Sequence, residues 1–417
     1  MTSVAAEPWF SASPLQRIFA LLNADGGEVR VVGGAVRNSL MGLPVSDIDM
    51  ATVLVPSEVV ARAKAAGIKS VPTGIAHGTV TLVLEGTPFE VTTLRRDVAT
   101  DGRHAEVAFG TDWKADAERR DFTINALYAG ADGLVADHTG GLKDIESRTI
   151  RFIGDAAQRI EEDHLRILRF FRFFAHYGSG RPDADGLRAS ARAKASLSRL
   201  SAERVWTEMK KLLSAKDPGR ALLWMRQAGV LTEVLPETEK WGIDTIPALI
   251  STETALGWRP DPLLRLAAMV PPDTDRLAAM SARLKMANAE TVFFEHWSLA
   301  PTVAAKTVDI VLDRLLYREG VSGVVTRLKL ALASVRQRAE GDMEALAEAA
   351  AFQRLLARAE RWKKPAFPLS GADVLKTGVV AGPRVGEILG TLETEWVDSN
   401  FNLDRATLVA RLEKLVR

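Results

Sequence analysis

The stretch VVGGAVRNSLMGLPVSDIDMAT, residues 31–52, decides the fold of the N-terminal region. A short apolar run ends at Gly33 and Gly34, and a segment of helical character begins near Ala35. Backbone N–H groups can approach an anion at such a turn, because glycine lacks Cβ and a helix start carries partial positive charge. A Gly-Gly turn is more often only a turn. Arg37 favours the interpretation as a phosphate-binding turn.

Two aspartates follow in the same stretch, Asp47 and Asp49, one residue apart. On an extended segment they project from the same side. Their mutual repulsion is costly unless a cation lies between them, and hard oxygen ligands favour Mg²⁺. The alternative is that they only cap the turn at residues 44–46. The glycine turn just upstream favours a site for a nucleoside triphosphate and metal ions.

Composition limits the other possibilities. The chain has 417 residues, 47% of them hydrophobic, which is enough for about two to four domains. No run is long and apolar enough for a bilayer span, and the first residues do not resemble a signal peptide, so we expect a cytoplasmic protein without a membrane partner. The chain contains no cysteine, which leaves oxygen ligands for a metal ion. Its net charge of +1 means that a nucleic-acid partner needs a local basic surface.

The pattern of the chain changes near residue 155. Residues 1–150 mix helices, one of them expected over 122–127, with β-like runs at 29–33, 79–85 and 88–95. Beyond residue 155 the pattern is helical almost throughout. The sequence therefore predicts an α/β region followed by an all-α region.

Four motifs in fixed order carry a resemblance to a known family. They are GGAVRN followed by DID, then ERRDFTINAL (118–127), GGLKDIESRTIRFIGD (140–155) and EEDHLRILRFFRFFA (161–175). Together they resemble class II tRNA nucleotidyltransferases, the CCA-adding enzymes, and the related bacterial poly(A) polymerases. The resemblance covers about residues 29–215 and implies an α+β fold. Its parts are a polymerase-beta-like head with a mixed sheet (1–150), a helical neck (151–235), and a helical body and tail (236–417).

The resemblance also implies roles for single residues. Gly33, Gly34 and Arg37 would hold the triphosphate, Asp47 and Asp49 would bind Mg²⁺, and Arg120 would contact the nucleotide. The family pattern has an aspartate where this chain has Asn38, which puts a local ion pair in doubt. Glu90, on a predicted strand, is our candidate for a third catalytic carboxylate. It could equally face water from an edge strand.

A row of charged residues spaced by three follows, on a stretch predicted to be one helix: Asp163, Arg166, Arg169 and Arg172. Cytosine and adenine share an amino donor beside a ring-nitrogen acceptor. A carboxylate next to an arginine therefore accepts both and leaves unpaired groups with uracil and guanine. Asp163 and Arg166 match that description, as the family's E-D-x-x-R motif implies, and Arg169 and Arg172 would face the nucleotide or the neighbouring domain. The alternative is a salt-bridged helix face.

Two further regions bear on RNA. The polar segment 95–107 is predicted to be a mobile loop. Residues 181–220 hold ten basic and five acidic side chains. This excess of positive charge suits either binding to backbone phosphates or an ordinary solvated helix face. The neighbouring motifs favour phosphate binding. The basic helices RLKLALASVRQRAE (327–340) and RAERWKKPAF (358–367) are candidates for binding the tRNA body.

These observations predict template-independent addition of C, C and A to the 3′ end of tRNA from CTP and ATP with Mg²⁺, releasing pyrophosphate. A poly(A) polymerase, or an enzyme that adds only part of CCA, shares every motif quoted. A non-catalytic RNA-binding protein is a third alternative, and the intact Asp47 and Asp49 argue against it. The sequence leaves the oligomeric state open.

Overall fold

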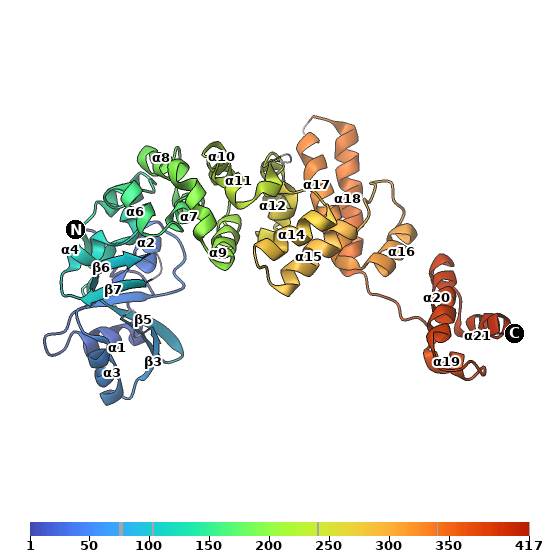
Figure 1. Ribbon diagram of the computed structural model, residues 1–417, viewed down its shortest axis with the longest axis horizontal. Helices are drawn as coiled ribbons and strands as arrows, with labels where there is room; N and C mark the ends of the chain where they lie inside the picture. The colour runs from blue at the N-terminus through green and yellow to red at the C-terminus, as the bar shows by residue number, and fades with distance from the viewer. Residues whose placement is uncertain (75–77, 102–103, 240–241, 340, 417) are drawn as a thin grey trace. The chain divides into compact units, whose positions relative to one another are not determined.

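The computed structural model describes residues 1–74, 78–101, 104–239, 242–339 and 341–416. The chain divides into two compact units, Met1–Pro236 and Glu237–Arg417 (Figure 1). Every strand of the described chain lies in the first unit, and the described part of the second unit is helical. The predicted α+β class, with an N-terminal sheet and a helical remainder, is confirmed.

A seven-stranded sheet forms the head, in the order β3-β4-β5-β2-β1-β8-β9. Strand β2 pairs with β5 in parallel and with β1 antiparallel, so the sheet is mixed as predicted. The strands are β1 (Val29–Val32), β2 (Asp49–Thr52), β3 (Lys69–Gly74), β4 (Thr79–Leu84), β5 (Thr87–Thr93), β8 (Leu127–Ala129) and β9 (Val135–Asp137). The three predicted strands correspond to β1, β4 and β5. The parallel pair brings the start of β2 beside the middle of β5.

Three helices cover this sheet: α1 (Ser13–Leu22), α2 (Gly34–Leu40) and α3 (Pro56–Ala65). Helix α1 buries Leu15, Ile18, Phe19 and Leu22, the spacing of one apolar helical face. Helix α2 packs on β1 and β8, and α3 packs on β3 and β4. The glycine turn between β1 and α2 is therefore fixed on both sides by buried elements.

Two predictions of local structure were wrong. The segment expected to be a mobile loop forms a second sheet, the hairpin β6 (Arg95–Asp101) and β7 (His104–Phe109), because its backbone groups pair from Arg95↔Phe109 onward. Residues 102–103 lie outside the described part. The helix expected over 122–127 is only a 3₁₀ turn, η2 (Thr123–Asn125), after which the chain enters β8 to pair with β1. Sheet pairing outweighed local helical preference there.

Helices dominate the rest of the first unit. They are α4 (Trp113–Glu118), α5 (Gly141–Glu146), α6 (Ala156–Glu162), α7 (Arg166–Tyr177), α8 (Ala184–Ala193), η3 (Lys194–Arg199), α9 (Ala202–Leu213), α10 (Gly219–Gln227) and α11 (Val230–Val234). Phe170 and Phe173 of α7 pack on Phe152 and Phe122, with ring centroids 5.5 and 5.1 Å apart. This aromatic cluster fixes α7 against the head and so positions the arginines between its phenylalanines.

The second unit consists of η4, which starts at the boundary (Pro236–Thr238), and ten longer helices among its described residues. They are α12 (Ile246–Leu256), α13 (Pro262–Met269), α14 (Thr274–Arg283), α15 (Asn288–Leu299), α16 (Asp309–Glu319), α17 (Val321–Arg338), α18 (Met343–Arg361), α19 (Gly371–Leu375), α20 (Pro383–Asp398) and α21 (Arg405–Val416). One core gathers around Leu328 and Leu355, and another around Leu392 and Leu408. None of the helices described in the chain has the length and apolar character to cross a membrane.

Candidate active site

Three carboxylates lie together where β2 begins beside β5, a place called the β2–β5 edge although both strands are interior strands of the sheet, so Glu90 is not on an edge strand. Asp49 begins β2 and lies directly opposite Glu90 of β5 in the parallel register, and Asp47 precedes it by two residues. All three residues have exposed surface, although protein atoms surround much of the Asp49 carboxyl group. Burial of its carboxyl group and the nearby charges of Glu90 and Asp47 raise the pKa of Asp49, while Arg120 opposes this rise. The edge therefore concentrates negative charge that a cation would relieve.

The donors at this edge are oxygen atoms, which suit a hard divalent ion. Among the residues that the structure describes, no three acidic or histidine side chains form a ready-made metal cluster. Mg²⁺ usually takes one or two protein carboxylates and completes its shell with water and substrate phosphates. The arrangement of Asp47, Asp49 and Glu90 fits that partial coordination, with the phosphates of a nucleotide supplying further oxygens.

The glycine turn lies next to these carboxylates in sequence and is built for close approach. Gly33 has φ +71°, a conformation strained for other residues, and its N–H donates to the Leu127 carbonyl at 3.1 Å. A Cβ at Gly33 would stand 3.4 Å from the Asn125 carbonyl oxygen and 4.0 Å from Arg120 Nη1. These are ordinary contact distances, so the positive φ is what favours glycine at this position beside the Arg120 guanidinium.

Arg120 is held by a buried network that sequence reasoning missed. Its Nε donates to Asp116 Oδ2 at 3.2 Å and to the Tyr128 hydroxyl at 3.0 Å, and Nη2 donates to Asp116 at 3.0 Å. The Tyr128 hydroxyl donates to the same Asp116 oxygen at 2.8 Å. The sequence clue was that Asp116 and Arg120 are four residues apart. The network aims a fixed positive charge between the glycine turn and Asp49.

Arg37 is turned into the protein. It is only 6% exposed. Its Nε and Nη2 donate to Asn38 Oδ1 at 3.1 and 2.9 Å, and Nη2 also donates to the Tyr177 hydroxyl at 2.8 Å. Nη1 donates to Asn125 Oδ1. Burial lowers the pKa of Arg37. The side chain links α2 to α7, and its predicted contact with the triphosphate stays a prediction.

The same contacts explain what Asn38 does in place of the family aspartate. Its amide oxygen accepts from Arg37, and its Nδ2 donates to the Pro44 carbonyl at 2.8 Å. An aspartate could not make the second bond, since an ionised carboxylate has no N–H. Asn38 therefore replaces an ion pair with hydrogen bonds from the Arg37 guanidinium to a neutral amide, and its own N–H fixes the segment leading to Asp47.

The prediction of one continuous helical ridge from Asp163 to Arg172 is wrong. Helix α6 ends at Glu162 and α7 begins at Arg166, and Asp163 between them has extended backbone angles, φ −150° and ψ 106°. Its Oδ1 accepts the Leu165 N–H at 3.1 Å, a local side-chain bond that competes with helix continuation. Asp163 thus lies at the break before α7 rather than on its ridge.

Each side chain of the predicted base-reading pair already has a protein partner. Asp163 accepts from Arg204 Nη2 of α9 at 2.8 and 3.1 Å. Arg166 donates from Nη1 to Glu162 Oε2 at 2.6 Å and to the Arg159 carbonyl at 2.9 Å. The two side chains share one turn of chain, since the Arg166 N–H donates to the Asp163 carbonyl at 3.0 Å. The partners hold both groups in place.

The other two arginines of α7 join elements of the first unit. Arg169 donates Nε to Asp121 Oδ2 at 2.8 Å and makes a second, shorter bond to the same oxygen from Nη2. Arg172 donates to Glu208 Oε2 of α9 at 2.5 Å. The sequence predicted that these two arginines face the nucleotide or the neighbouring domain. The structure places them on carboxylates, and a nucleotide contact stays a prediction.

The basic segment 181–220 keeps most of its positive charge on the surface. Seven of its ten basic residues are exposed: Arg181, Arg188, Arg192, Arg199, Lys211, Lys216 and Arg220. Three of its five acids pair with arginines, namely Asp183 with Arg151, Asp185 with Arg188 and Glu208 with Arg172. The exposed surface of this segment is therefore positively charged, as phosphate binding requires.

The chain is similar to known proteins over most of its length. Residues 29–151 match the family model described as Poly A polymerase head domain, and residues 183–241 match Probable RNA and SrmB-binding site of polymerase A. The chain is 33% identical over 408 residues to CCA tRNA nucleotidyltransferase 1, mitochondrial, of Mus musculus, covering 96% of this chain and 90% of that one. It is 30% identical over 406 residues to the CCA-adding enzyme of Limosilactobacillus fermentum, covering 97% of each.

A solved structure is similar over the same length. The crystal structure of the Bacillus stearothermophilus CCA-adding enzyme in complex with CTP has a TM-score of 0.67 to this chain at 26% identity, covering 96% of both chains. The match spans both units of the present chain. These likenesses agree with the four sequence motifs in their order and extend beyond the part of the chain that carries them.

Proposed function

The chain belongs to the family of CCA-adding tRNA nucleotidyltransferases, and on this premise we propose that it adds C, C and A to the 3′ end of tRNA without a nucleic-acid template. The nucleotides are CTP and ATP, and pyrophosphate is released. One observation supports this most: the parallel β2–β5 pair sets Asp49 beside Glu90, near a glycine turn and a fixed arginine. Phosphoryl transfer needs carboxylates and phosphate-binding groups in that proximity.

The reaction joins the RNA 3′ oxygen to the α-phosphorus of the nucleotide. The bond from that phosphorus to the bridging oxygen of the β-phosphate breaks as the new bond forms. Gly33 and Gly34 leave room for phosphate oxygens at the turn. Arg120, held by Asp116 and Tyr128, offers positive charge to the phosphates without a reorganisation cost.

Nucleotidyltransferases of this kind generally use divalent metal ions. We propose Mg²⁺ as the ion, with Asp47 and Asp49 as its protein ligands and Glu90 as the third carboxylate. When bound, the ion supplies Lewis-acid stabilisation of charge on the phosphate oxygens. The three carboxylates contribute the negative charge that holds the ion at the β2–β5 edge. Chelation should stop nucleotide addition, and restoring Mg²⁺ should recover it.

Selection of the base is assigned to Asp163 and Arg166. The carboxylate accepts from the exocyclic amino group that C and A share, and the guanidinium donates to the adjacent ring nitrogen. Arg204 and Glu162 are positioning residues for these two groups. U and G present a carbonyl beside an N–H, so each would leave a donor facing a donor and an acceptor facing an acceptor.

The tRNA is assigned to the neck and the second unit. The exposed basic residues of 181–220 would hold backbone phosphates, with an affinity that falls as salt rises. We propose the functional regions as a catalytic head (1–150), a base-selecting and RNA-binding neck (151–235), and a body and tail that contact tRNA (236–417). A cytoplasmic location stays a prediction, since the name of the mouse relative is mitochondrial.

An incorporation assay tests the proposal. Purified protein is given tRNA ending before CCA, before CA or before A, with each of the four nucleoside triphosphates in turn. We expect C, C and then A, after which addition stops. A long A tail would indicate poly(A) polymerase, and incorporation of C alone or A alone would indicate a partial enzyme. RNA binding without any incorporation would leave only the non-catalytic alternative.

A further inference from the structure

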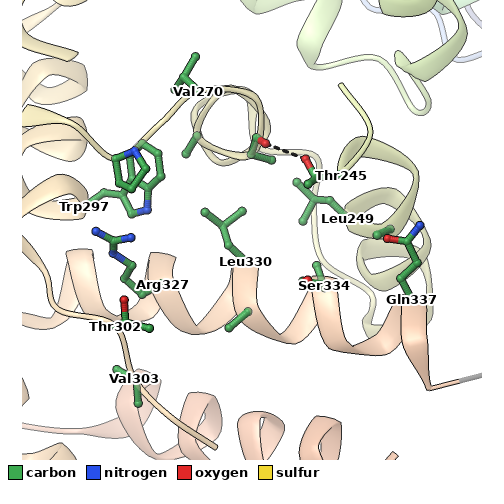
Figure 2. Close-up of a pocket in the computed structure, with 16 residues that line it drawn as sticks. Thr245, Leu249, Val270, Trp297, Thr302, Val303, Arg327, Leu330, Ser334 and Gln337 are labelled. Atoms are coloured by element: carbon green, nitrogen blue, oxygen red, sulfur yellow. Dashed lines mark hydrogen bonds between the residues drawn. The ribbon is translucent and has the colours of Figure 1, made fainter. Parts of the chain in front are cut away.

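A cavity in the second unit is lined by none of the residues of the candidate active site. It has a volume of about 310 Å³ and lies among α12, α13, α15 and α17 (Figure 2). Its floor is apolar and buried, formed by side chains such as Leu249, Val270 and Val303. Its mouth carries exposed polar residues, including Ser334 and Gln337. The volume is at the small end of the range of ligand pockets, about 300 to 1,000 Å³.

One side of α17 faces this cavity. Arg327, Leu330, Ser334 and Gln337 recur at spacings of three and four, which places them on one helical face. Figure 2 shows Arg327 and Trp297 together at one end and Ser334 and Gln337 at the other, with Leu330 between them. Arg327 belongs to the basic helix assigned from sequence to tRNA. The structure turns it toward the cavity instead.

Arg327 lacks a counterion. It donates from Nε to the Ala300 carbonyl at 2.9 Å and from Nη2 to the Ser298 carbonyl at 3.2 Å. No carboxylate of the described residues forms an ion pair with it. Burial lowers the pKa of Arg327, as expected for a desolvated cation without a nearby anion. A partly buried positive charge of this kind is costly unless an anion joins it.

The neighbouring indole gives a second, independent observation. Trp297 is 2% exposed, and its Nε1–H finds no acceptor among the residues described. The Arg327 guanidinium lies 5.7 Å from the centre of the Trp297 ring. One end of this largely apolar cavity thus contains a cation without a carboxylate partner and an unsatisfied donor. Buried groups of this kind normally have partners.

We propose that this cavity binds a small monocarboxylate with an apolar body. The carboxylate accepts hydrogen bonds from Arg327 and places negative charge beside the Trp297 N–H. The hydrocarbon lies against Leu330 and the apolar floor. One negative charge balances the one uncompensated guanidinium, and at about 30 Å³ per water-sized group the cavity takes about ten non-hydrogen atoms.

Calorimetric titration of the full chain with straight-chain carboxylates from pentanoate to decanoate tests this inference. We expect saturable binding at one site that tightens about fourfold per added CH₂ until the cavity is full. The primary alcohol of equal length should bind at least about tenfold more weakly, because it lacks the charge that pairs with Arg327.

Variants separate the charged contact from the apolar one. Arg327→Met should weaken carboxylate binding at least about tenfold and leave alcohol binding nearly unchanged. Ser334→Phe should block the mouth and weaken both ligands, and because Ser334 is exposed the variant should fold. Arg338→Met is the matched control, since Arg338 lies on the same helix but pairs with Glu348 outside the cavity.

Three outcomes would overturn the inference. Equal binding of carboxylates and alcohols would leave only an apolar cavity. Wild-type affinity for carboxylates in both Arg327→Met and Ser334→Phe would place the ligand elsewhere. Absence of carboxylate binding, together with a loss of tRNA affinity in Ser334→Phe, would assign the cavity to nucleic acid. Nucleotide addition is not used as a readout, so failure here leaves the proposed function untouched.

Discussion

The β2–β5 edge and the arginine face of α7 differ in how their charges are partnered. At the edge, Asp47, Asp49 and Glu90 carry like charges. Burial of the Asp49 carboxyl group, together with the charge of Glu90, raises the pKa of Asp49. On α7, Arg166, Arg169 and Arg172 each pair with a carboxylate. Burial acts to raise the pKa of Asp121, but Arg169 and hydrogen bonds from Asn125 and Phe122 outweigh it and lower that pKa.

This difference distinguishes charges that can bind a ligand from charges that hold the fold together. Negative charge left unmatched costs stability and is available to a cation, whereas matched charge fixes the elements that carry it. Removing a charge at the edge should therefore harm chemistry and spare the fold. Removing a charge from the Arg169 or Arg172 pair should do the reverse, whereas Arg166 is also assigned to base selection. The predictions below test these two expectations, beginning with the largest effect.

Asp49→Asn or Asp47→Asn should lower nucleotide addition at least about 10³-fold, since each removes an oxygen charge that holds the metal ion. The free energy of unfolding should stay the same or rise, because repulsion at the edge is relieved. Addition rates and urea unfolding measure the two effects. Glu85→Gln is the control, an exposed carboxylate paired with Arg17 away from the site. Near-normal addition in either aspartate variant would remove this edge from the mechanism.

Glu208→Gln should destabilise the first unit by about 3 kcal/mol, because it leaves the half-buried Arg172 without its anion. Urea unfolding of the full chain measures the change. Asp185→Asn is the control, since its pair with Arg188 is fully exposed and should contribute less than about 1 kcal/mol. If both variants unfold at the same urea concentration as the wild type, the α7 pairs are not structural.

The same contrast explains what could be predicted from the sequence. Strands β1, β4 and β5 follow local apolar patterns, and the aspartates of DID follow a motif, so both were accessible. Glu90 was only a candidate for the third carboxylate, because it is strand pairing that places it opposite Asp49, from which it is distant in sequence. A site formed by residues that are close in sequence can be predicted before the fold is known.

The α7 region was less predictable because its side chains act through distant partners. Asp163 bonds to the Leu165 N–H and to Arg204, 41 residues away, and this interrupts an otherwise helical pattern. The fixing of Arg120 depends on Tyr128, whose position follows from β8 entering the sheet. Arg37 likewise reaches Tyr177 across 140 residues. Periodicity contains no information about such contacts.

Arg166→Ala should reduce discrimination between CTP and UTP by about tenfold, because the shared edge of C and A loses its donor. Binding of the triphosphate should change little, since Arg120 and the β2–β5 edge remain. Single-nucleotide incorporation with all four triphosphates measures the ratio. Arg159→Ala is the matched control, because Arg159 pairs with the same Glu162 at 2.9 Å. Wild-type ratios in Arg166→Ala would make this residue structural and place base selection elsewhere.

The smallest expected effect concerns His176, at the end of α7. Burial lowers its pKa, the hydrogen bond with the Lys211 carbonyl opposes this, and the positive charges of Arg172 and Arg37 add to the lowering. As pH falls below about 6.5, the unfolded chain takes up this proton before the folded chain does. The free energy of unfolding should therefore decrease from pH 7.5 to 5.5, a window in which ordinary carboxylates stay ionised. His176→Gln should remove part of that decrease, as measured by urea unfolding at closely spaced pH values. If the free energy of unfolding of the variant depends on pH as in the wild type, burial and the charges of Arg172 and Arg37 do not disfavour protonation of His176.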